Sequence, residues 1–360
     1  MHVTLVRPSE LGASEVGRWR ALQEADPAFD NPFLSPEFTI TVGELRDMVW
    51  VAVVYDGPDI VGFFPFERHP LGIGRPVAAG LTDAQGMIHL KDADIHPHRL
   101  LKLCGLSVYE YDHLVAGQPM ERAKADAYPS PIINLRDGYA PYTEFLREHS
   151  GKTYKSTLAK TRKLQRDLGE VRHDYATADL APLRTLLSWK TDQYRRTGRT
   201  DRFAHQWIVE LVERLLDTRT ESFAGVLDMV YVDGTPLAGH FGIRTRTTLA
   251  GWFPAYDTSF AKYSPGLIQH LAMAEKAAGS GIQVIDMGRG HKEYKEKLKN
   301  GELMVSEGRI ARLSPSAGVH WMLRVPARKA RATVLANPLL HRTADKALKT
   351  YGRLRAVLPQ

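Results

Sequence analysis

Two segments far apart in the chain carry nearly the same hairpin sequence. DGPDIVGFFPF at residues 56–66 aligns without a gap with DGTPLAGHFGI at residues 233–243, with Asp, Gly, Gly and Phe at the same four places. Each copy follows an apolar run, at residues 49–55 and 225–232. Asp-Gly between such runs indicates a β-hairpin, because the tight turn needs positive φ. Two interpretations remain open: an internal repeat, or two unrelated hairpins with the same turn chemistry.

A true repeat predicts an α/β chain of two similar units, each with a mixed, mostly antiparallel sheet flanked by helices. A length of 360 residues agrees with two domains. We place the first unit at residues 1–150 and the second at residues 151–310. A basic helical tail follows at residues 311–360.

Three helices are predicted between the two hairpins. Residues 153–169 form the first, closed by Gly169, and residues 180–198 and 204–218 form the others. In the first helix we expect the packed side and the cationic side to differ. The packed residues are Tyr154, Leu158 and Leu168, and the cations are Lys155, Lys160, Arg162, Lys163 and Arg166.

The second hairpin is followed by a strand, a helix and a strand. Ser264 is a good N-cap and Pro265 suits the first helical position, with Lys262 and Tyr263 directly before them. A helix N-terminus after a strand offers free N–H groups and a positive dipole end, which bind phosphate or pyrophosphate. The alternative is an ordinary capped helix packed on a sheet.

The stretch GIQVIDMGRGHKEYKEKLKN, residues 281–300, starts as a buried strand and ends as a lysine-rich helix. Asp286 ends the strand, and Gly288 and Gly290 allow a tight turn with close approach to a ligand. Asp286 can orient an amine or hold a proton, Tyr294 can donate one, and Lys295 can pair with a phosphate or carboxylate. In the alternative interpretation Asp286 only caps backbone N–H groups in the turn, and the lysines are a solvated face.

Further candidates come from other segments. His240 stands in the second hairpin where the first has Phe63, and an imidazole in a cleft can act as a base. Trp252 lines the same cleft or belongs to the core. Asp83 closes the site from the first unit or caps a turn, and Lys190 and Tyr194 contact the acceptor or lie on a helix surface.

The charge distribution and the cysteine and histidine content indicate which kinds of ligand and site to expect. Residues 1–150 carry 13 Lys/Arg and 21 Asp/Glu, whereas residues 151–360 carry 35 and 20. A basic half is typical of a chain that binds a polyanion, and solubilising charge is the plain alternative. Cys104 is the only cysteine, and there is no His-x-x-x-His pair with a supporting carboxylate motif, so we expect no disulfide and no metal site. The first residues lack a signal-peptide pattern and no apolar run is long enough to cross a bilayer, which favours the cytoplasm.

Six segments make the chain resemble the cellulose-biosynthesis (CelD/BcsL, BioF-like) acetyltransferases of the Gcn5-related (GNAT) superfamily. The most specific are YSPGLIQHLAMAEKAAGSGI (263–282) and IDMGRGHKEYKEKL (285–298). The others are NPFLSPEF (31–38), VGFFPFERH (61–69), LTDAQGMI (81–88) and WKTDQYRRTGRTDRF (189–203). The resemblance implies two GNAT-like units in tandem, akin to the FemABX aminoacyl-tRNA-dependent peptidyltransferases.

The resemblance also implies acyl transfer from a thioester to an amine or hydroxyl of a small molecule, amino sugar or polysaccharide precursor. Acyl-CoA is then a co-substrate, and no cofactor is bound permanently. The phosphate loop departs from the usual Arg/Gln-x-x-Gly-x-Gly/Ala pattern, because AKYSPGL (261–267) has one glycine. The expected catalytic residues are Asp286, His240, Tyr294 and Lys295. The expected co-substrate-binding residues are Lys262, Tyr263, Ser264, Gly266, Gly288 and Gly290, and the expected acceptor-binding residues are Asp83, Lys190, Tyr194 and Trp252.

Two other functions remain open. A FemABX-like ligase would use aminoacyl-tRNA, which the basic helix at 153–169 favours. A non-catalytic binding protein would keep the fold without the chemistry. The tail has a basic amphipathic helix pattern at residues 342–358, which either contacts an anionic membrane surface or packs on the body.

Overall fold

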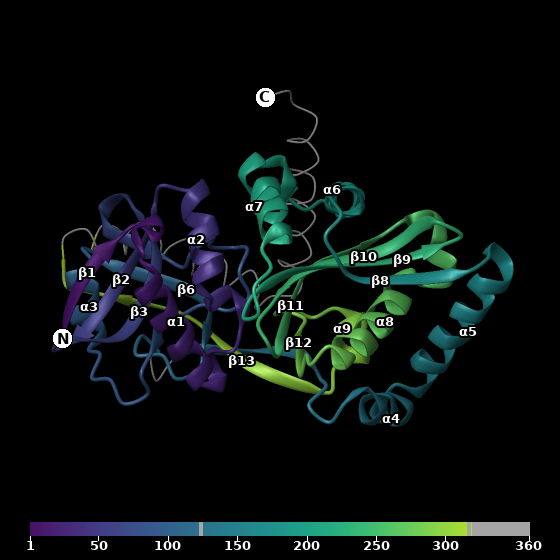
Figure 1. Cartoon of the computed structure of the whole chain (residues 1–360), viewed down its shortest axis with the longest axis horizontal. Coiled ribbons are helices and arrows are strands. Elements are labelled where there is room, and N and C mark those ends of the chain that lie inside the picture. The colour runs from purple at the N-terminus through teal and green to yellow at the C-terminus, as the bar shows by residue number, and fades with distance from the viewer. Residues whose placement is uncertain (122–124, 315–317, 319–360) are drawn as a thin grey trace, which may run out of the picture.

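The computed structural model describes residues 1–121, 125–314 and 318 (Figure 1). The predicted helix at 342–358 and its contact with a membrane surface lie outside the described residues. Within the described residues, no helix has both the length and the apolar character needed to cross a bilayer.

The described strands form one continuous sheet (Figure 1). Its order is β1-β2-β3-β4-β6-β13-β7-β12-β11-β10-β9-β8, and β5 pairs with β3. Most neighbours are antiparallel, and the β4–β6 and β11–β12 pairs are parallel. The strands are β1 (His2–Val6), β2 (Val49–Asp56), β3 (Asp59–His69), β4 (Ile73–Arg75), β5 (Ile88–His89), β6 (Val108–Val115), β7 (Asp126–Asn134), β8 (Val171–Thr177), β9 (Ala224–Val232), β10 (Thr235–Arg244), β11 (Thr248–Tyr256), β12 (Val284–Asp286) and β13 (Gly301–Ala311). The predicted mixed, mostly antiparallel sheet flanked by helices is confirmed.

Both predicted hairpins are present, as β2–β3 and β9–β10. Gly57 has φ of 57°, and Asp233 and Gly234 have φ of 45° and 77°, as tight hairpin turns require. Each hairpin also has a register irregularity close to its turn, at Val54/Tyr55 in one and at Pro236/Ala238 in the other. The two copies therefore share a tight hairpin, but their turns are offset by one residue in the alignment, because Asp56 pairs with Asp59 across the first and Val232 with Thr235 across the second.

The two halves of the sheet exchange strands where they meet. β7, from the first 150 residues, pairs with β12 and with β13. β13, from the end of the described chain, lies between β7 and β6 and runs from one half of the molecule to the other (Figure 1). The division into units at residues 150 and 310 stays a prediction, because the two halves share these strands.

Helices cover both faces of the second half of the sheet (Figure 1). The helices are α1 (Ala13–Ala25), α2 (Pro36–Leu45), α3 (Pro97–Leu103), α4 (Tyr139–His149), α5 (Gly151–Leu168), α6 (Leu180–Thr197), α7 (Gln206–Asp217), α8 (Pro265–Gly279) and α9 (Glu293–Leu298). α6 and α7 pack on one face and join α1 and α2 in one core, whereas α4 and α8 pack on the other. β9 is buried along its whole length because both of its faces are covered, which explains its nearly continuous apolar sequence.

The packed side of α5 agrees with the prediction at Tyr154 and differs from it at Leu158 and Leu168. Tyr154, Thr157 and Leu164 are its buried residues, whereas Leu158 and Leu168 are each 39% exposed. Leu158 lies about 120° around the helix from Leu164, at 100° per residue, and so falls outside the stripe that faces the sheet, whereas Leu168 is the last residue of the helix. The cationic side is exposed, as expected, apart from the half-buried Lys160.

Candidate functional site

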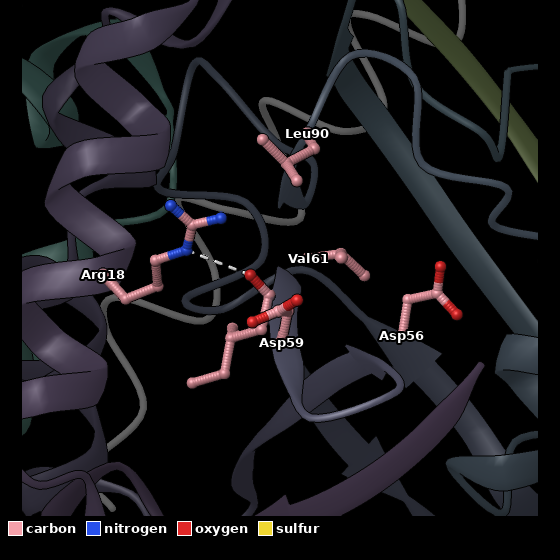
Figure 2. Close-up of a pocket in the computed structure, with 6 residues that line it drawn as sticks. Arg18, Asp56, Asp59, Val61 and Leu90 are labelled. Atoms are coloured by element: carbon pink, nitrogen blue, oxygen red, sulfur yellow. Dashed lines mark hydrogen bonds between the residues drawn. The ribbon is translucent and has the colours of Figure 1, made fainter.

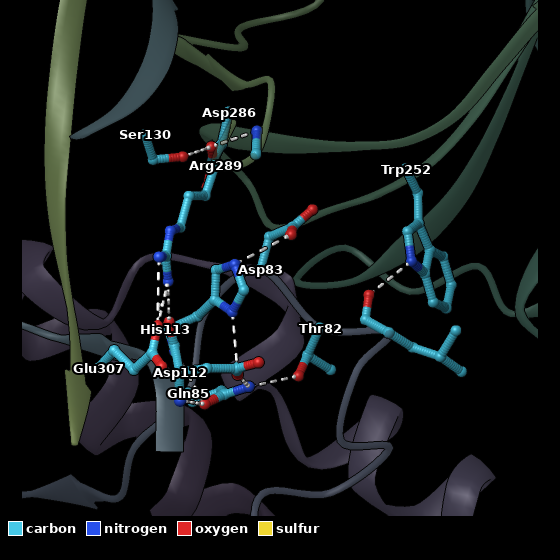
Figure 3. A network of polar contacts seen from close by, with 12 residues as sticks. Thr82, Asp83, Gln85, Asp112, His113, Ser130, Trp252, Asp286, Arg289 and Glu307 are labelled. Atoms are coloured by element: carbon cyan, nitrogen blue, oxygen red, sulfur yellow. Dashed lines mark hydrogen bonds and ion pairs between the residues drawn. The ribbon is translucent and has the colours of Figure 1, made fainter. Parts of the chain in front are cut away.

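Asp286 lies at the junction of the two halves and is almost fully buried. Its carboxylate accepts hydrogen bonds from Asn31 Nδ2 at 3.1 Å, Ser130 Oγ at 2.9 Å and the backbone N–H of Gly288 at 2.9 Å (Figure 3). Burial raises the pKa of Asp286, and these three hydrogen bonds oppose the rise. With its oxygens occupied, Asp286 holds the turn in place and joins it to Asn31 and to β7.

The turn after β12 has the geometry that its glycines predicted. Gly288 and Gly290 have φ of 74° and 113°. Lys295 is buried, and its Nζ donates to the carbonyl oxygens of Gly288 at 2.8 Å and Arg289 at 3.4 Å. The Arg289 side chain lies over the Tyr128 ring and pairs with Glu307, which anchors the turn to β7 and β13. Lys295 therefore clamps the turn, and burial lowers its pKa.

Asp83 faces this turn from the first half of the molecule. A Cβ on Gly288 would lie 2.5 Å from Asp83 Oδ2, so only glycine fits beside that carboxylate. His113 Nε2 lies 3.7 Å from Asp83 Oδ1, and His113 Nδ1 lies 3.0 Å from Asp112 Oδ1 (Figure 3). The structure thus brings Asp83 together with Asp286, Gly288 and Lys295, as the sequence predicted.

Asp83 has the properties of a general base. Burial raises its pKa to about 6, against the opposing charge of His113 and with the charge of Asp286 adding to the rise. Even so, 28% of its side chain is exposed. A carboxylate that is strongly desolvated and still partly exposed can meet a substrate and accept its proton.

His240 and His270 are both buried and lie next to each other. A Cβ on Gly251 would lie 2.9 Å from His240 Nε2 and 3.1 Å from the Asp286 carbonyl oxygen, so this glycine makes room for the imidazole. The His240 and His270 ring centroids are 5.9 Å apart, and that of Tyr294 is 5.1 Å from His270. His240, Tyr294 and the turn therefore belong to one cluster.

The pKa shifts of His240, His270 and Tyr294 indicate different roles for these three side chains. Burial lowers the pKa of His240 well below its ordinary value, and it lowers that of His270 to about 4. His240 is therefore a neutral imidazole and a weak base, and its buried Nδ1 has no hydrogen-bond partner among the described residues. Burial raises the pKa of Tyr294 to about 12, so its hydroxyl stays protonated and can donate.

Lys190 enters the cluster from α6. Its Nζ donates to the Pro254 carbonyl oxygen at 2.8 Å, and Pro254 faces His240 across the β10–β11 ladder. Lys190 also lies 5.5 Å from the centroid of the buried Tyr194 ring. Burial lowers the pKa of Lys190 to about 7, and the positive charges of Arg199, Arg202, Lys292 and Lys295 add to the effect.

Three of those cations lack an acidic partner. In the part of the chain that the structure describes, no carboxylate lies within ion-pair distance of Arg199, Arg202 or Lys292. The nearby Asp201 carboxylate caps the backbone N–H of Phe203 and accepts from Thr191 Oγ1. Like charges that gather without counter-charges favour the binding of an anion.

The residues predicted to bind the co-substrate lie at the start of α8. Ser264 is the N-cap residue, but its Oγ accepts from Lys160 Nζ at 2.7 Å and makes no capping bond. Tyr263 is buried and its hydroxyl donates to Asp167, whereas Lys262 is exposed. The Gly266 carbonyl oxygen accepts a hydrogen bond from His270 Nδ1 at 2.6 Å. This contact links the start of α8 to the cluster that contains Tyr294.

Trp252 is part of the core. Its ring packs edge-on against Phe33 and Phe38, with centroids 5.3 and 6.1 Å away. Its indole N–H donates to the Leu81 carbonyl oxygen at 2.8 Å (Figure 3). Trp252 therefore fixes the loop that carries Asp83, and its contacts do not support the predicted role in binding the acceptor.

A separate hollow of about 350 Å³ lies in the first half (Figure 2). It sits beside the β2–β3 turn, and Arg18 Nε spans it to donate to the Ile60 carbonyl oxygen. Its lining residues are Arg18, Asp56, Asp59, Ile60, Val61 and Leu90. None of the cluster residues described above lines it.

Residues 151–296 match a known family. That family is described as the acetyltransferase (GNAT) domain. The matched range contains α6, the β9–β10 hairpin, α8 and the turn at Gly288. Among curated proteins, none matches the chain in sequence.

Solved structures extend the likeness to the whole fold. The crystal structure of FemX is 9% identical with a TM-score of 0.62, over 90% of this chain and 99% of that one. A conserved protein of unknown function from Bacteroides thetaiotaomicron is 12% identical with a TM-score of 0.53, over 85% and 100%. A tandem GNAT protein from the clavulanic acid biosynthesis pathway is 8% identical over 86% and 98%, and its TM-score of 0.46 is too low to support an argument. At these identities the likeness establishes the fold alone.

The matched range, residues 151–296, does not contain the whole cluster, because Asp83 and His113 come before residue 151. Sequence reasoning also missed several members: Asn31, Asp112, His113, Ser130, Arg199, Arg202, His270, Arg289 and Lys292. Asn31 lies in NPFLSPEF and Arg202 in WKTDQYRRTGRTDRF, so the motifs pointed to those segments. Nothing in the local sequence around His113 signals its contact with Asp83.

Proposed function

We propose that this protein transfers an acyl group from acyl-CoA to an amine or hydroxyl of a small acceptor, such as an amino sugar or a polysaccharide precursor. The match of residues 151–296 to the GNAT domain supports the reaction class. The single observation that carries the proposal is Asp83, a desolvated but reachable carboxylate with a pKa of about 6 beside the Gly288 turn. The motifs at 263–282 and 285–298 support the finer assignment to the CelD/BcsL type.

The chemistry needs a base and a proton donor. Asp83 accepts the proton that the attacking nitrogen or oxygen loses as its bond to the carbonyl carbon forms. The Tyr294 hydroxyl, which stays protonated, donates to the thiolate as the carbon–sulfur bond breaks. The products are an amide or ester and free CoA thiol, and no covalent enzyme intermediate is required.

The carbonyl oxygen gains negative charge during the attack and needs donors aimed at it. In this site His240 is a neutral imidazole with an unpaired ring nitrogen, which suits a hydrogen-bonding role better than the predicted role as base. Binding of CoA phosphates at the start of α8, next to Lys262 and Lys160, would direct the thioester past Gly266 and His270 toward Tyr294.

The cations without acidic partners indicate the chemical class of acceptor that the site would bind. Arg199, Arg202 and Lys292 surround Lys190 without acidic partners, as described above. An acceptor that carries a phosphate or carboxylate would supply the missing charge and raise the pKa of Lys190. We therefore propose an anionic acceptor with a free amine or hydroxyl.

The test is release of CoA thiol by the purified full chain, with acetyl-CoA and matched pairs of amines that do or do not carry an anionic group. We expect turnover with the anionic members and a loss of about 10²- to 10⁴-fold in Asp83→Asn. Asp59→Asn, which changes an exposed carboxylate at the Figure 2 hollow, is the matched control and should keep full activity. No thiol release with any acyl-CoA would remove the proposal.

A FemABX-like, aminoacyl-tRNA-dependent ligase is the second candidate, and α5 favours it. Five exposed cations lie on one outward face of this helix, and its buried residues point the other way. They are Lys152, Lys155, Arg162, Lys163 and Arg166. Among the described residues only Arg166 has an acidic partner, Asp167 at 3.8 Å.

The ligase predicts tRNA binding that weakens steeply with added salt. Charge reversal of Lys155 and Arg162 should abolish that binding and leave CoA-dependent turnover unchanged. A third function, a non-catalytic binding protein, predicts that Asp83→Asn and Tyr294→Phe leave the biological activity intact.

A further inference from the structure

We propose that His113 is a positioning residue for Asp83, clamped by Asp112 so that Nε2 faces the carboxylate and keeps it in its proton-accepting form. This inference rests on the proposed acyl transfer, in which Asp83 is the base. It adds a residue outside the matched GNAT domain to the site, on strand β6 of the first half.

The His113 ring is bracketed by two carboxylates. Nε2 lies 3.7 Å from Asp83 Oδ1 and Nδ1 lies 3.0 Å from Asp112 Oδ1 (Figure 3). Only 16% of the side chain is exposed. A hydrogen bond from one ring nitrogen fixes the orientation of an imidazole and thereby directs the other nitrogen.

Gln85 makes this arrangement rigid. Its Nε2 donates to Asp112 Oδ1 at 2.7 Å, and its Oε1 accepts the backbone N–H groups of Asp112 and His113, each at 3.0 Å. Its own backbone N–H donates to the His113 carbonyl oxygen at 2.8 Å. Because Gln85 is two residues after Asp83, the loop that carries the base is locked to the strand that carries His113.

Several charges act on the Asp83 carboxylate, and His113 is the strongest of those that favour ionisation. Burial and Asp286 raise its pKa, whereas His113, Lys295 and Arg202 lower it, and His113 has the largest effect of these three. Tyr294 also faces Asp83. His113 itself faces Asp83 and Asp112, and Arg289 bonds to the Asp112 carbonyl oxygen. Loss of the imidazole would leave burial and Asp286 opposed only by Lys295 and Arg202.

The test is His113→Gln, which keeps a hydrogen-bond donor and removes the imidazole ring. In a plot of kcat/KM against pH, we expect the acidic limb to move to higher pH by about one unit, with a smaller change in KM. Asp112→Asn releases the ring without removing it, and should move the limb in the same direction by less. His98→Gln, an exposed histidine on α3, is the control and should leave the profile unchanged.

A second readout does not depend on turnover. Titration of Asp83 by carbon NMR, with labelled aspartate and Asp83→Asn for assignment, should give a higher midpoint in His113→Gln than in the parent. An unchanged midpoint and an unchanged kcat/KM profile in His113→Gln would overturn the inference while leaving acyl transfer intact. If the parent shows no acyl transfer at all, the proposed function fails, and the NMR midpoint alone decides the contact between His113 and Asp83.

Discussion

The two hairpins have similar sequences, yet they surround different interiors. In the first, Phe63 is fully buried and stacks on Trp19 with centroids 4.8 Å apart. At the matching place in the second, His240 is equally buried but polar, and Gly251 leaves room for its ring. One copy is a filled core, and the other leads to a cluster of titratable groups. The duplicated scaffold supplies the geometry, and a few polar replacements supply the candidate site.

Exchange of the two residues tests this difference most strongly. Phe63→His places an imidazole in a packed core and should destabilise the fold by about 4 kcal/mol. His240→Phe should leave the free energy of unfolding within about 1 kcal/mol, because it removes a buried ring nitrogen that has no hydrogen-bond partner among the described residues, and it should abolish acyl transfer. Urea unfolding and thiol release measure the two effects. Equal destabilisation by both exchanges would show that the second hairpin is a core like the first.

The pH dependence of stability should also separate the two halves. The folded state raises the pKa of Asp83 from 3.8 to about 6, so it favours the protonated form. The group therefore stabilises the fold below pH 3.8, and that contribution is lost as the pH rises through about 6. Asp83→Asn should be more stable than the parent above pH 6, by up to about 3 kcal/mol, and should lose this advantage near pH 4. Asp59→Asn should show no such crossing, and a constant difference between Asp83→Asn and the parent across this range would contradict the burial of the ionised group.

The two glycines of the turn offer a matched pair. A Cβ at Gly288 would lie 2.5 Å from Asp83 Oδ2, whereas a Cβ at Gly290 would meet open space, and both residues have positive φ. Backbone strain should destabilise both alanine variants by about 1–2 kcal/mol. Only Gly288→Ala should also displace Asp83 and reduce kcat strongly. Equal losses of kcat would mean that Asp83 has no part in the reaction.

Lys190 should produce the smallest effect, confined to acceptor binding. Burial and nearby cations lower its pKa to about 7, so it loses its charge as the pH rises through that value. KM for an anionic acceptor should therefore increase above pH 7, and Lys190→Met should remove that dependence. Steady-state kinetics between pH 6 and 8.5 measure it, with Lys152→Met on α5 as the control. A pH-independent KM in the parent would argue against an anion beside Lys190.

Local features were predictable from the sequence. The Asp-Gly turns, the helix ends at Gly169 and Gly198, and the glycine turn after Asp286 all have chemistry that acts over a few residues. Proximity of Asp286, Gly288 and Lys295 follows from the same short segment. The prediction for the packed side of α5 was wrong at Leu158 and Leu168. The positions of apolar residues alone do not show which stripe of a helix meets a sheet.

The junction of the two halves was not predictable. β7 and β13 pair although their sequences are far apart, as at Ile132 and Gly301, and register across such a distance leaves no local pattern. β13 also pairs with β6, which carries His113. The candidate base and its neighbours thus depend on long-range strand order, whereas the turn that faces them depends on two glycines.

A crystal structure of the full chain with a non-hydrolysable acyl-CoA tests most directly whether acyl transfer takes place between the two halves. The pyrophosphate should lie at the start of α8, and the acyl carbonyl should lie between Tyr294 and Asp83, within hydrogen-bond reach of an added acceptor. A ligand bound at the Arg18 hollow of the first half, or one whose acyl group points away from Asp83, would contradict the site proposed here.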